Sequence, residues 1–391
     1  MKDLPKNFWL LSFSLFFFMV SFNAIIPELN QFITQLGGEN SKGLIITLFT
    51  ISAAISRPFS GKLSDTIGRK KVILFGGAIA IIITLLYPLS LSVYFFLTLR
   101  FLHGFAAGFL PTGATALVTD ILPENKRGYG MGIWGVFISL GIGFGQYAGS
   151  MIASQYGLNN LFFFATAFAV ISILLQLGLK ETLAQTQTFK FSLLKIKWKD
   201  IIEPSVIPSA LVMFLTAICS GIVFVIVPDL AHFVGIENKG SFFGIYVLST
   251  IVIRLASGRI SDRIGRANMM IISVSMLALS MLLVGITTDI HSFILAAIVF
   301  GVATGLSSPT LFAWTADLSD IDRRGVGSGT MFIALELGIM IGSYSTMFIY
   351  NNQLNSIWQT TFIGIASCLF ALVYLIFHQL KKRKIKQLNK P

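Results

Sequence analysis

Five ionisable side chains lie inside long apolar stretches of the chain. Glu28, Arg100, Asp229 and Glu336 each stand among apolar residues, and His103 follows Arg100 by about one helical turn. A charge at membrane depth is costly, so such residues are by default candidates for proton binding or ion pairing. The chemistry that they suggest is reversible protonation or ion pairing.

Twelve apolar segments, each near the roughly 20 residues that cross a hydrocarbon core, carry these side chains. Of the 391 residues, 54% are hydrophobic and 12% are charged. The charged share is about half that of a soluble protein. A soluble enzyme, a nucleic-acid-binding protein and a secreted disulfide scaffold are therefore excluded. The predicted membrane spans are 8–33, 42–61, 72–92, 94–119, 129–154, 159–179, 205–233, 241–258, 268–287, 291–317, 326–350 and 357–379.

Basic residues predict the orientation of these spans. With a cytoplasmic N-terminus, 24 of the 29 Lys and Arg fall in cytoplasmic loops and tails, and only Lys42 and Lys239 fall outside. This bias predicts a protein of the cytoplasmic (inner) membrane with both termini in the cytoplasm. The basic residues behind the net charge of +12 are then explained by the orientation of the spans and by contact with membrane lipid. No nucleic-acid partner is expected. Within the spans, Arg57 and Arg254 are expected to extend to the inner surface.

The chain contains an internal repeat. Residues 57–69 (RPFSGKLSDTIGR) and 254–266 (RLASGRISDRIGR) are identical at eight of thirteen positions, at an offset of 197. The same offset relates Gly104 to Gly301, Asp120 to Asp317, Gly141 to Gly338 and Gly145 to Gly342, and Pro27-Glu28 matches Pro228-Asp229 at an offset of 201. The repeat predicts two halves of equal orientation. The parts are an N-terminal half (1–180), a cytoplasmic linker (181–204) and a C-terminal half with a basic tail (205–391).

The loop between the second and third spans, GKLSDTIGRK (61–70), resembles the G-x-L-x-D-x-x-G-R-K motif of the major facilitator superfamily. The whole chain resembles this family, and its nearest branch is the twelve-helix drug:proton antiporters. The resemblance implies an all-α integral membrane protein with twelve transmembrane helices in two six-helix repeats. It also implies a substrate site near the midplane, between halves that rock against each other.

Two further motifs resemble those of proton-coupled members of the family. Arg100, His103 and Gly104 follow the R-x-x-Q-G pattern, with His in place of Gln. Glycines in the fifth span have the spacing of the antiporter motif, which implies close helix packing. They are Gly132, Gly141, Gly145 and Gly149. Gln146 stands where that motif usually has Pro, and Ser150 stands where it usually has a second Gly.

The duplicated loop implies a cytoplasmic gate. By resemblance, Asp65 meets the start of the eleventh helix near Gly325, where exposed N–H groups favour an anion. Arg69 is expected to pair with Asp120. The second half supplies the equivalent residues Asp262, Arg266 and Asp317, and glycines suited to turns complete the gate: Gly61, Gly68, Gly258 and Gly265.

Depth along each span separates the candidates for proton coupling. Glu28 and Arg100 lie about 8 Å and about 9 Å from the outer ends of their spans, so the two side chains are expected to be able to pair. Asp229 lies at a similar depth. Glu336 lies about 16 Å from the cytoplasmic end, without a basic residue in its own span. Desolvation favours its neutral form, which makes it the best candidate proton carrier. His103 is a candidate relay, with simple hydrogen bonding as the alternative.

The sequence therefore predicts a secondary active transporter. The first hypothesis is a proton-coupled exporter of a small amphipathic compound, such as a drug-like molecule or a siderophore. The alternative is a proton symporter or facilitator that imports a small metabolite or an iron chelate. A receptor on the same fold belongs to another class, and loss of flux with retained ligand binding would distinguish it.

An enzyme is not expected, because the sequence contains no H-E-x-x-H motif, nucleophile elbow or paired-metal constellation. A nucleotide-driven pump is excluded because the sequence contains no G-x-x-x-x-G-K-[ST] motif. No cofactor and no metal are expected. The predicted partners are a small-molecule substrate, protons and membrane lipid, and the protein is predicted to be a monomer.

Overall fold

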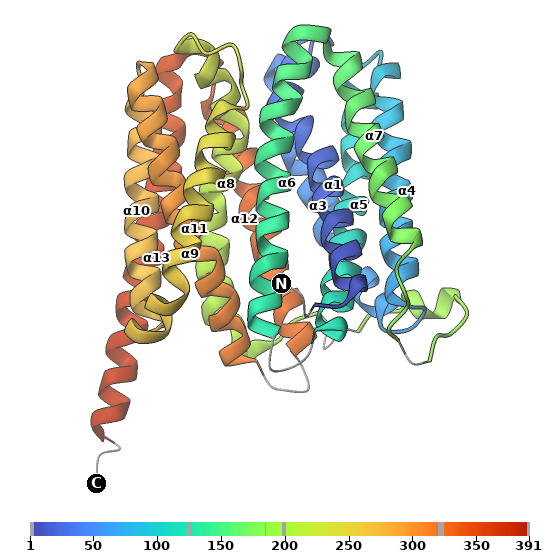
Figure 1. Cartoon of the computed structure of the whole chain (residues 1–391). Helices are drawn as coiled ribbons and strands as arrows, with labels where there is room; N and C mark the ends of the chain where they lie inside the picture. Colours follow the sequence, from blue (N-terminus) through green and yellow to red (C-terminus); the bar gives the residue numbers. More distant parts are fainter. Residues whose placement is uncertain (1–3, 123–126, 184, 198–200, 320–323, 389–391) are drawn as a thin grey trace.

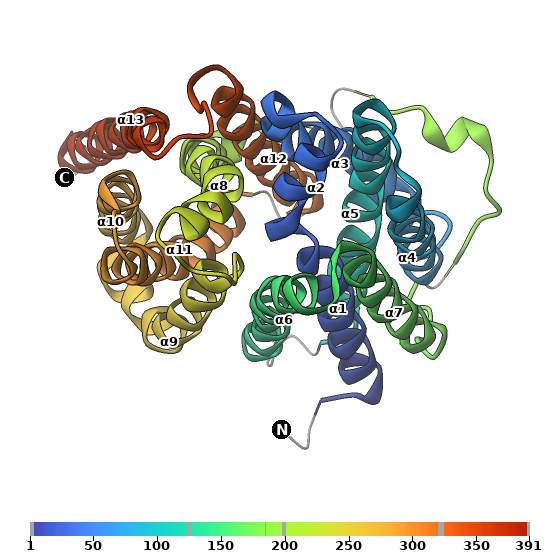
Figure 2. The ribbon, with the colours of Figure 1, turned by 90° about the horizontal axis from the view of Figure 1, so that it is seen from above.

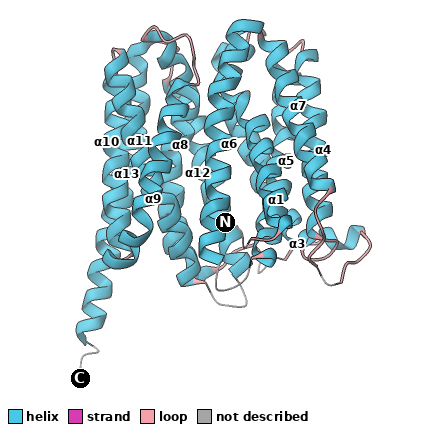
Figure 3. Ribbon diagram, in the orientation of Figure 1, coloured by secondary structure: helices cyan, strands magenta, loops and turns pink. Residues whose placement is uncertain are grey.

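A computed structural model describes residues 4–122, 127–183, 185–197, 201–319 and 324–388; among these, the side chains of 119, 127–129, 131, 132, 255–263, 316, 324, 325, 328 and 382–388 lie outside the description. The described residues are helical or loop, without strands (Figure 3). Eleven described helical spans are long and apolar enough to cross a membrane. The remaining predicted span, 241–258, falls on α9 (Ser241–Ile264), whose described apolar stretch is Ser241–Arg254. The predicted all-α integral membrane fold is confirmed.

The helices form two bundles side by side, which we call the N half and the C half (Figures 1 and 2). The N half contains α1 (Lys6–Ala24), α2 (Leu29–Gln35), α3 (Lys42–Ser64), α4 (Arg69–Leu86), α5 (Val93–Ile121), α6 (Arg127–Tyr156) and α7 (Leu158–Leu177). The C half contains α8 (Ile207–Phe233), α9, α10 (Arg266–Ile286), α11 (Ile290–Leu318), α12 (Arg324–Ile349) and α13 (Leu354–Leu388). We call the end at which α1 begins and α13 ends the inner end, and the opposite end the outer end (Figure 1).

Equivalent residues start equivalent helices in the two halves. Gly68 and Gly265 precede α4 and α10 with φ of +120° and +88°, a region that a side chain disfavours. The side chains of Ser92 and Asp289 cap the starts of α5 and α11 by accepting backbone N–H bonds. The repeat is thus expressed in backbone geometry, although the two sequences differ at most positions.

The first predicted span is not a single helix, in contrast to the expectation for 8–33. It breaks after Ala24 into a 3-10 turn at Ile26–Glu28, followed by α2. Pro27 lacks the N–H that would continue the helix, and the carbonyl of Asn23 accepts instead from Ile25. The equivalent Pro228 lies inside the continuous α8. The break places Glu28 at a discontinuity in the backbone.

The two halves approach each other closely toward the outer end. A Cβ atom on Gly43 of α3 would lie 2.5 Å from the carbonyl oxygen of Ser343 in α12, and one on Gly240 would lie 2.1 Å from that of Gln146 in α6. Toward the inner end, a Cβ on Gly61 or Gly329 would meet only open space among the described atoms. The helices therefore close the outer end in this conformation.

The linker after α7 lies against the inner end of the N half. The backbone N–H of Gln187 donates to the Thr66 carbonyl over 2.8 Å, and Lys62 Nζ donates to the Lys195 carbonyl over 2.6 Å. Leu193 and Leu194 pack on an apolar cluster around Leu63, Val72 and Phe109. The linker is therefore docked on protein over this stretch.

Candidate functional site

The mid-depth carboxylate Glu336 has a basic partner in the other half. Arg57 Nη2 of α3 lies 2.5 Å from Glu336 Oε1 of α12, and Arg57 Nε donates to the same oxygen over 3.2 Å. The two side chains are only 12% and 8% exposed, and the guanidinium lies 4.7 Å from the ring centre of Phe332. The expectation that Arg57 reaches the inner surface is wrong, because a buried opposite charge on the facing helix binds its guanidinium.

The repeat places a different partner opposite the second arginine. Arg254 of α9 corresponds to Arg57, and its Nη1 donates to Ser139 Oγ of α6 over 2.8 Å. Ser139 occupies the repeat position of Glu336, since both equivalences have the offset of 197. Arg254 Nη2 also donates to Ser308 Oγ over 2.6 Å. Each of these two equivalent contacts between the halves thus contains an arginine. The partner of Arg57 is a carboxylate, whereas the partner of Arg254 on the other half is a hydroxyl.

Arg100 and Glu28 do not form the predicted pair. Arg100 is 1% exposed, and its guanidinium donates to the Ile45 carbonyl over 3.2 Å and to the Tyr87 hydroxyl over 3.3 Å. The same guanidinium lies 4.8 Å from the ring centre of Phe49. The backbone carbonyl, the hydroxyl and the ring face satisfy it inside the N half, whereas the helix break turns Glu28 toward the C half.

His103 lies in the same buried cluster as Arg100. Its Nδ1 is 3.0 Å from the Tyr87 hydroxyl, and its ring packs edge-on against Phe22 and Phe49. The Tyr87 hydroxyl therefore links Arg100 and His103 within the N half. Two roles were predicted for His103, a proton relay or simple hydrogen bonding. These contacts favour hydrogen bonding within the N half.

Glu28 and Asp229 both lie at the outer interface between the halves. Glu28 accepts from Ser150 Oγ at 2.6 Å and from Lys239 Nζ at 3.0 Å. Asp229 Oδ2 accepts from Lys42 Nζ at 2.7 Å and from the Tyr350 hydroxyl at 2.8 Å. These ion pairs were not predicted from the sequence, although Lys42 and Lys239 are the two basic residues that are predicted on the side opposite the cytoplasm.

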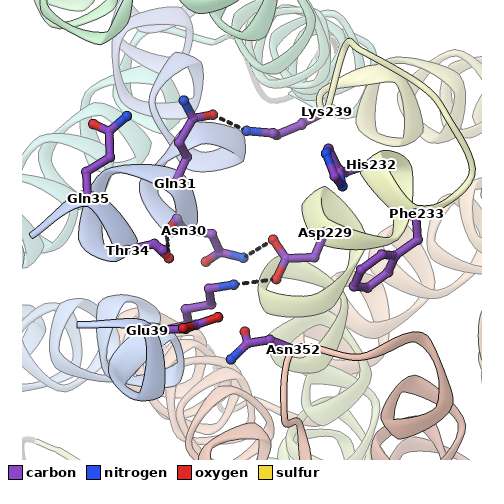
Figure 4. A pocket seen from close by; sticks show the side chains of 11 residues that line it. Asn30, Gln31, Thr34, Gln35, Glu39, Asp229, His232, Phe233, Lys239 and Asn352 are labelled. Atoms are coloured by element: carbon purple, nitrogen blue, oxygen red, sulfur yellow. Dashed lines mark hydrogen bonds and ion pairs between the residues drawn. The ribbon is translucent and has the colours of Figure 1, made fainter. Parts of the chain in front are cut away.

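A pocket of about 320 Å³ opens beside these pairs at the outer end. Most of the residues that line it are polar or charged, and they come from both halves (Figure 4). Asn30 points across it to Asp229, with Nδ2 3.3 Å from Oδ1, and Lys239 donates to Gln31. The pocket thus lies at the outer interface beside ion pairs whose side chains are 5–17% exposed.

At the inner end, the structure contains the expected pair of Arg69 and Asp120, with Nε 3.2 Å from Oδ2. Arg69 also binds Asp65, which caps the end of α3. In the C half, Arg266 Nε lies 3.0 Å from Asp317 Oδ2. Residues 320–323 before α12 and the side-chain positions of 324 and 325 lie outside the description, so the predicted contact of Asp65 near Gly325 falls there. The surroundings of Gly132 and Gly258 and the Asp262 side chain lie outside it as well.

Gly61 and Gly258 are not turn glycines, in contrast to the expectation, because α3 continues through Gly61 to Ser64 and α9 continues through Gly258 to Ile264. Gly68 and Gly265 do have the backbone of a turn, with positive φ. The three described antiporter-motif glycines face α1. A Cβ on Gly141, Gly145 or Gly149 would lie 2.7, 2.7 or 2.1 Å from a carbonyl oxygen of that helix.

Sequence reasoning also missed Glu181, an anion at the start of α4. Its carboxylate accepts from the backbone N–H groups of Arg69 and Lys70, each over 3.0 Å. Partial burial alone would raise the pKa of Glu181, but hydrogen bonds from the backbone N–H groups of residues 69, 70, 182 and 183 outweigh it and lower the pKa. Thr182 Oγ1 adds a bond of 2.6 Å to Asp120 Oδ2, so the linker joins the charged cluster.

A family model described as the Major Facilitator Superfamily matches residues 11–235 and again residues 209–390. The chain belongs to the major facilitator superfamily. It is therefore a multi-pass membrane protein of a transporter family. The two matches overlap the two halves, in agreement with a fold built from a duplicated unit.

Relatives within the superfamily include transporters named for drug resistance. The chain is 22% identical over 360 residues to an uncharacterized MFS-type transporter of Methanocaldococcus jannaschii, covering 89% of this chain and 92% of the relative. It is 26% identical to the quinolone resistance protein NorA of Staphylococcus aureus over 54% of this chain and 56% of NorA. It is 34% identical to the multidrug resistance protein MdtG of Citrobacter koseri over 40% of each chain. The matches to NorA and MdtG thus span about half or less of those proteins.

Solved structures of other superfamily members have the same fold. The human organic anion transporter MFSD10 (TETRAN) superposes with a TM-score of 0.73 at 19% identity, covering 95% of this chain and 100% of that chain. The nucleoside transporter NupG superposes with a TM-score of 0.75 at 15% identity, covering 96% and 99%. At these identities the likeness concerns the fold alone.

Proposed function

We propose that this protein is a proton-coupled exporter of a small amphipathic compound, such as a drug-like molecule or a siderophore, and that it works by alternating access. The observation that carries the proposal is the buried ion pair of Arg57 and Glu336 between the halves. The partial matches to NorA and MdtG, which are named for drug resistance, support the choice of substrate class.

Protonation of Glu336 removes the negative charge that holds the Arg57 guanidinium. In a low-dielectric setting, the ion pair stabilises the contact of α3 with α12 only while the carboxylate is ionised. A proton therefore favours a conformation in which α3 and α12 separate. Coupling further requires that substrate and proton favour opposite conformations, since a ligand shifts an equilibrium only through differential affinity.

Arg100 supports this mechanism by holding the N half together around Ile45, Tyr87 and Phe49. The pairs of Arg69 with Asp120 and of Arg266 with Asp317 belong to the proposed gate at the inner end, together with Asp65 and Asp262. We place the inner end in the cytoplasm because it carries most of the basic residues.

An importer of a small metabolite or an iron chelate is the second candidate. The observation that favours it is the departure from the antiporter motif at Gln146 and Ser150. Ser150 donates to Glu28, and Gln146 is fully buried, with neither amide atom hydrogen-bonded within the described part of the chain.

Proton movement in inside-out vesicles with an acidic lumen tests the proposal. Cationic drugs, siderophores and acidic metabolites are added in turn to vesicles with the wild type, Glu336→Gln or Arg100→Ala. Export by antiport predicts compound-dependent loss of the gradient that Glu336→Gln abolishes. Substrate flux that is independent of the gradient, with Glu336→Gln as active as wild type, contradicts proton coupling.

A further inference from the structure

We propose that Lys42–Asp229 and Lys239–Glu28 together form an outer gate, which must open for the central region to reach the outer side. The inference rests on the proposed alternating access but concerns residues outside the Arg57–Glu336 pair. In each ion pair, one half supplies the lysine and the other half supplies the carboxylate. The nitrogen-to-oxygen distances are 2.7 Å and 3.0 Å.

The two pairs are related by the internal repeat. Lys42 and Lys239 are separated by the general offset of 197, and Glu28 and Asp229 are separated by the offset of 201 that the longer first outer loop produces. Each half thus contributes one lysine and one carboxylate, and each of these residues pairs with a residue of the other half. Two equivalent pairs resist both sliding and separation of the halves, whereas a single pair would act as a pivot.

The pairs are buried enough to contribute to closure. The side chains of Lys42 and Asp229 are 11% and 16% exposed, and those of Lys239 and Glu28 are 17% and 5% exposed. Paired charges that are sheltered from water interact more strongly than exposed pairs. Their loss should therefore shift the conformational equilibrium measurably.

Neutral hydrogen bonds between the halves surround the ion pairs. Asn30 Nδ2 donates to the Val225 carbonyl over 2.7 Å, and Asn238 Nδ2 donates to the Tyr147 carbonyl over 3.2 Å. Deeper along the interface, Thr47 Oγ1 and Ser343 Oγ lie 2.9 Å apart. Thr47 is only 4% exposed, so opening of the gate would expose this residue to the outer side.

Cysteine labelling at Thr47 tests the gate without a substrate and without a measurement of transport. Thr47→Cys is placed in a Cys219→Ala/Cys368→Ala background, and intact cells are treated with a membrane-impermeant maleimide. Lys42→Met or Lys239→Met is expected to raise the labelling rate about tenfold, which corresponds to about 1.4 kcal/mol in the closing equilibrium. The double variant should be labelled faster than either single variant. Ser343→Cys serves as a second reporter on the facing helix.

Two variants make the test specific for the ion pairs. The exchange Lys42→Asp/Asp229→Lys keeps a pair of opposite charges, so its labelling rate should return toward that of the wild type. Glu237→Gln removes an exposed charge from the loop that carries Lys239, and it should leave labelling unchanged. Slow labelling in the Lys42→Met/Lys239→Met variant, or equally fast labelling in Glu237→Gln, would overturn the gate. Neither result depends on whether transport is coupled to protons.

Discussion

Arg57 and Glu336 form a buried ion pair between α3 and α12, with Nη2 2.5 Å from Oε1. Glu336 lies about 18 Å along α12 from its inner start, and Arg57 lies about 10 Å from the inner end of α3. The pair therefore joins the two halves at membrane depth and apart from the outer lysine–carboxylate pairs. Its partners come from opposite repeats, so any rocking of the halves must change it.

A double-mutant cycle should detect the coupling of these two residues. Glu336→Gln leaves the Arg57 guanidinium buried without its charged partner and is expected to destabilise the protein more than Arg57→Met does. The double variant should be more stable than the sum of the single effects predicts, by roughly 1–3 kcal/mol. Thermal unfolding in detergent measures these differences. Additive effects would show that the pair does not contribute to stability.

A carboxylate at residue 139 should restore part of what Glu336→Gln removes. Ser139 faces Arg254 just as Glu336 faces Arg57, so Ser139→Glu places a carboxylate at the equivalent crossing. In the Glu336→Gln background, this change is expected to raise the unfolding temperature and to restore some proton-dependent flux. Ser139→Gln adds a similar volume without charge and is the matched control. Equal behaviour of Glu and Gln at residue 139 would contradict an electrostatic role.

The hydroxyl of Tyr87 should stabilise the buried cluster in the N half. Tyr87→Phe removes the oxygen that binds both Arg100 and His103, at 3.3 Å and 3.0 Å. Leaving these groups without that partner is expected to cost about 1–3 kcal/mol, seen as a lower unfolding temperature. Tyr94→Phe, at a residue that is 85% exposed, should have no effect.

The glycines of α6 should differ sharply in their tolerance of alanine. At Gly149 an added Cβ would lie 2.1 Å from the Ala24 carbonyl oxygen, so α1 and α6 must move apart. We expect Gly149→Ala to destabilise the protein by about 1–3 kcal/mol. At Gly135 the Cβ would meet open space among the described atoms, and Gly135→Ala should be neutral or slightly stabilising. Unfolding temperatures of the two purified variants provide the comparison.

Glu181 should fasten the linker to the start of α4 in a pH-dependent way. Because its pKa is lowered in the docked state, docking is favoured at pH above the usual carboxyl value of 4.5 and is lost as the pH falls through the lowered pKa. At neutral pH, Glu181→Gln is expected to raise hydrogen exchange of the Arg69 and Lys70 amides roughly fivefold. Exchange of these amides that is equal in both proteins would show that the carboxylate does not hold the linker.

The sequence alone determined the class of fold and its main divisions. Apolar length predicts spans, and the offset of 197 predicts two equivalent halves, because both signals are carried by residues near one another in the chain. The same reasoning singled out Glu28, Arg100, Asp229 and Glu336. Their cost at membrane depth depends on residue type and position along a span, which the sequence states directly.

Only the tertiary structure decided which charges meet within the spans and at the outer end. The depth argument paired Glu28 with Arg100, but depth leaves open the rotation of each helix and the identity of its neighbour. The break at Pro27 directs Glu28 to Lys239, while Arg100 is satisfied by Ile45 and Tyr87. The partners of Glu336 and of Glu181 likewise come from segments distant in the chain. Charge pairing depends on distance and direction between helices, and these are set by the packing of the whole bundle.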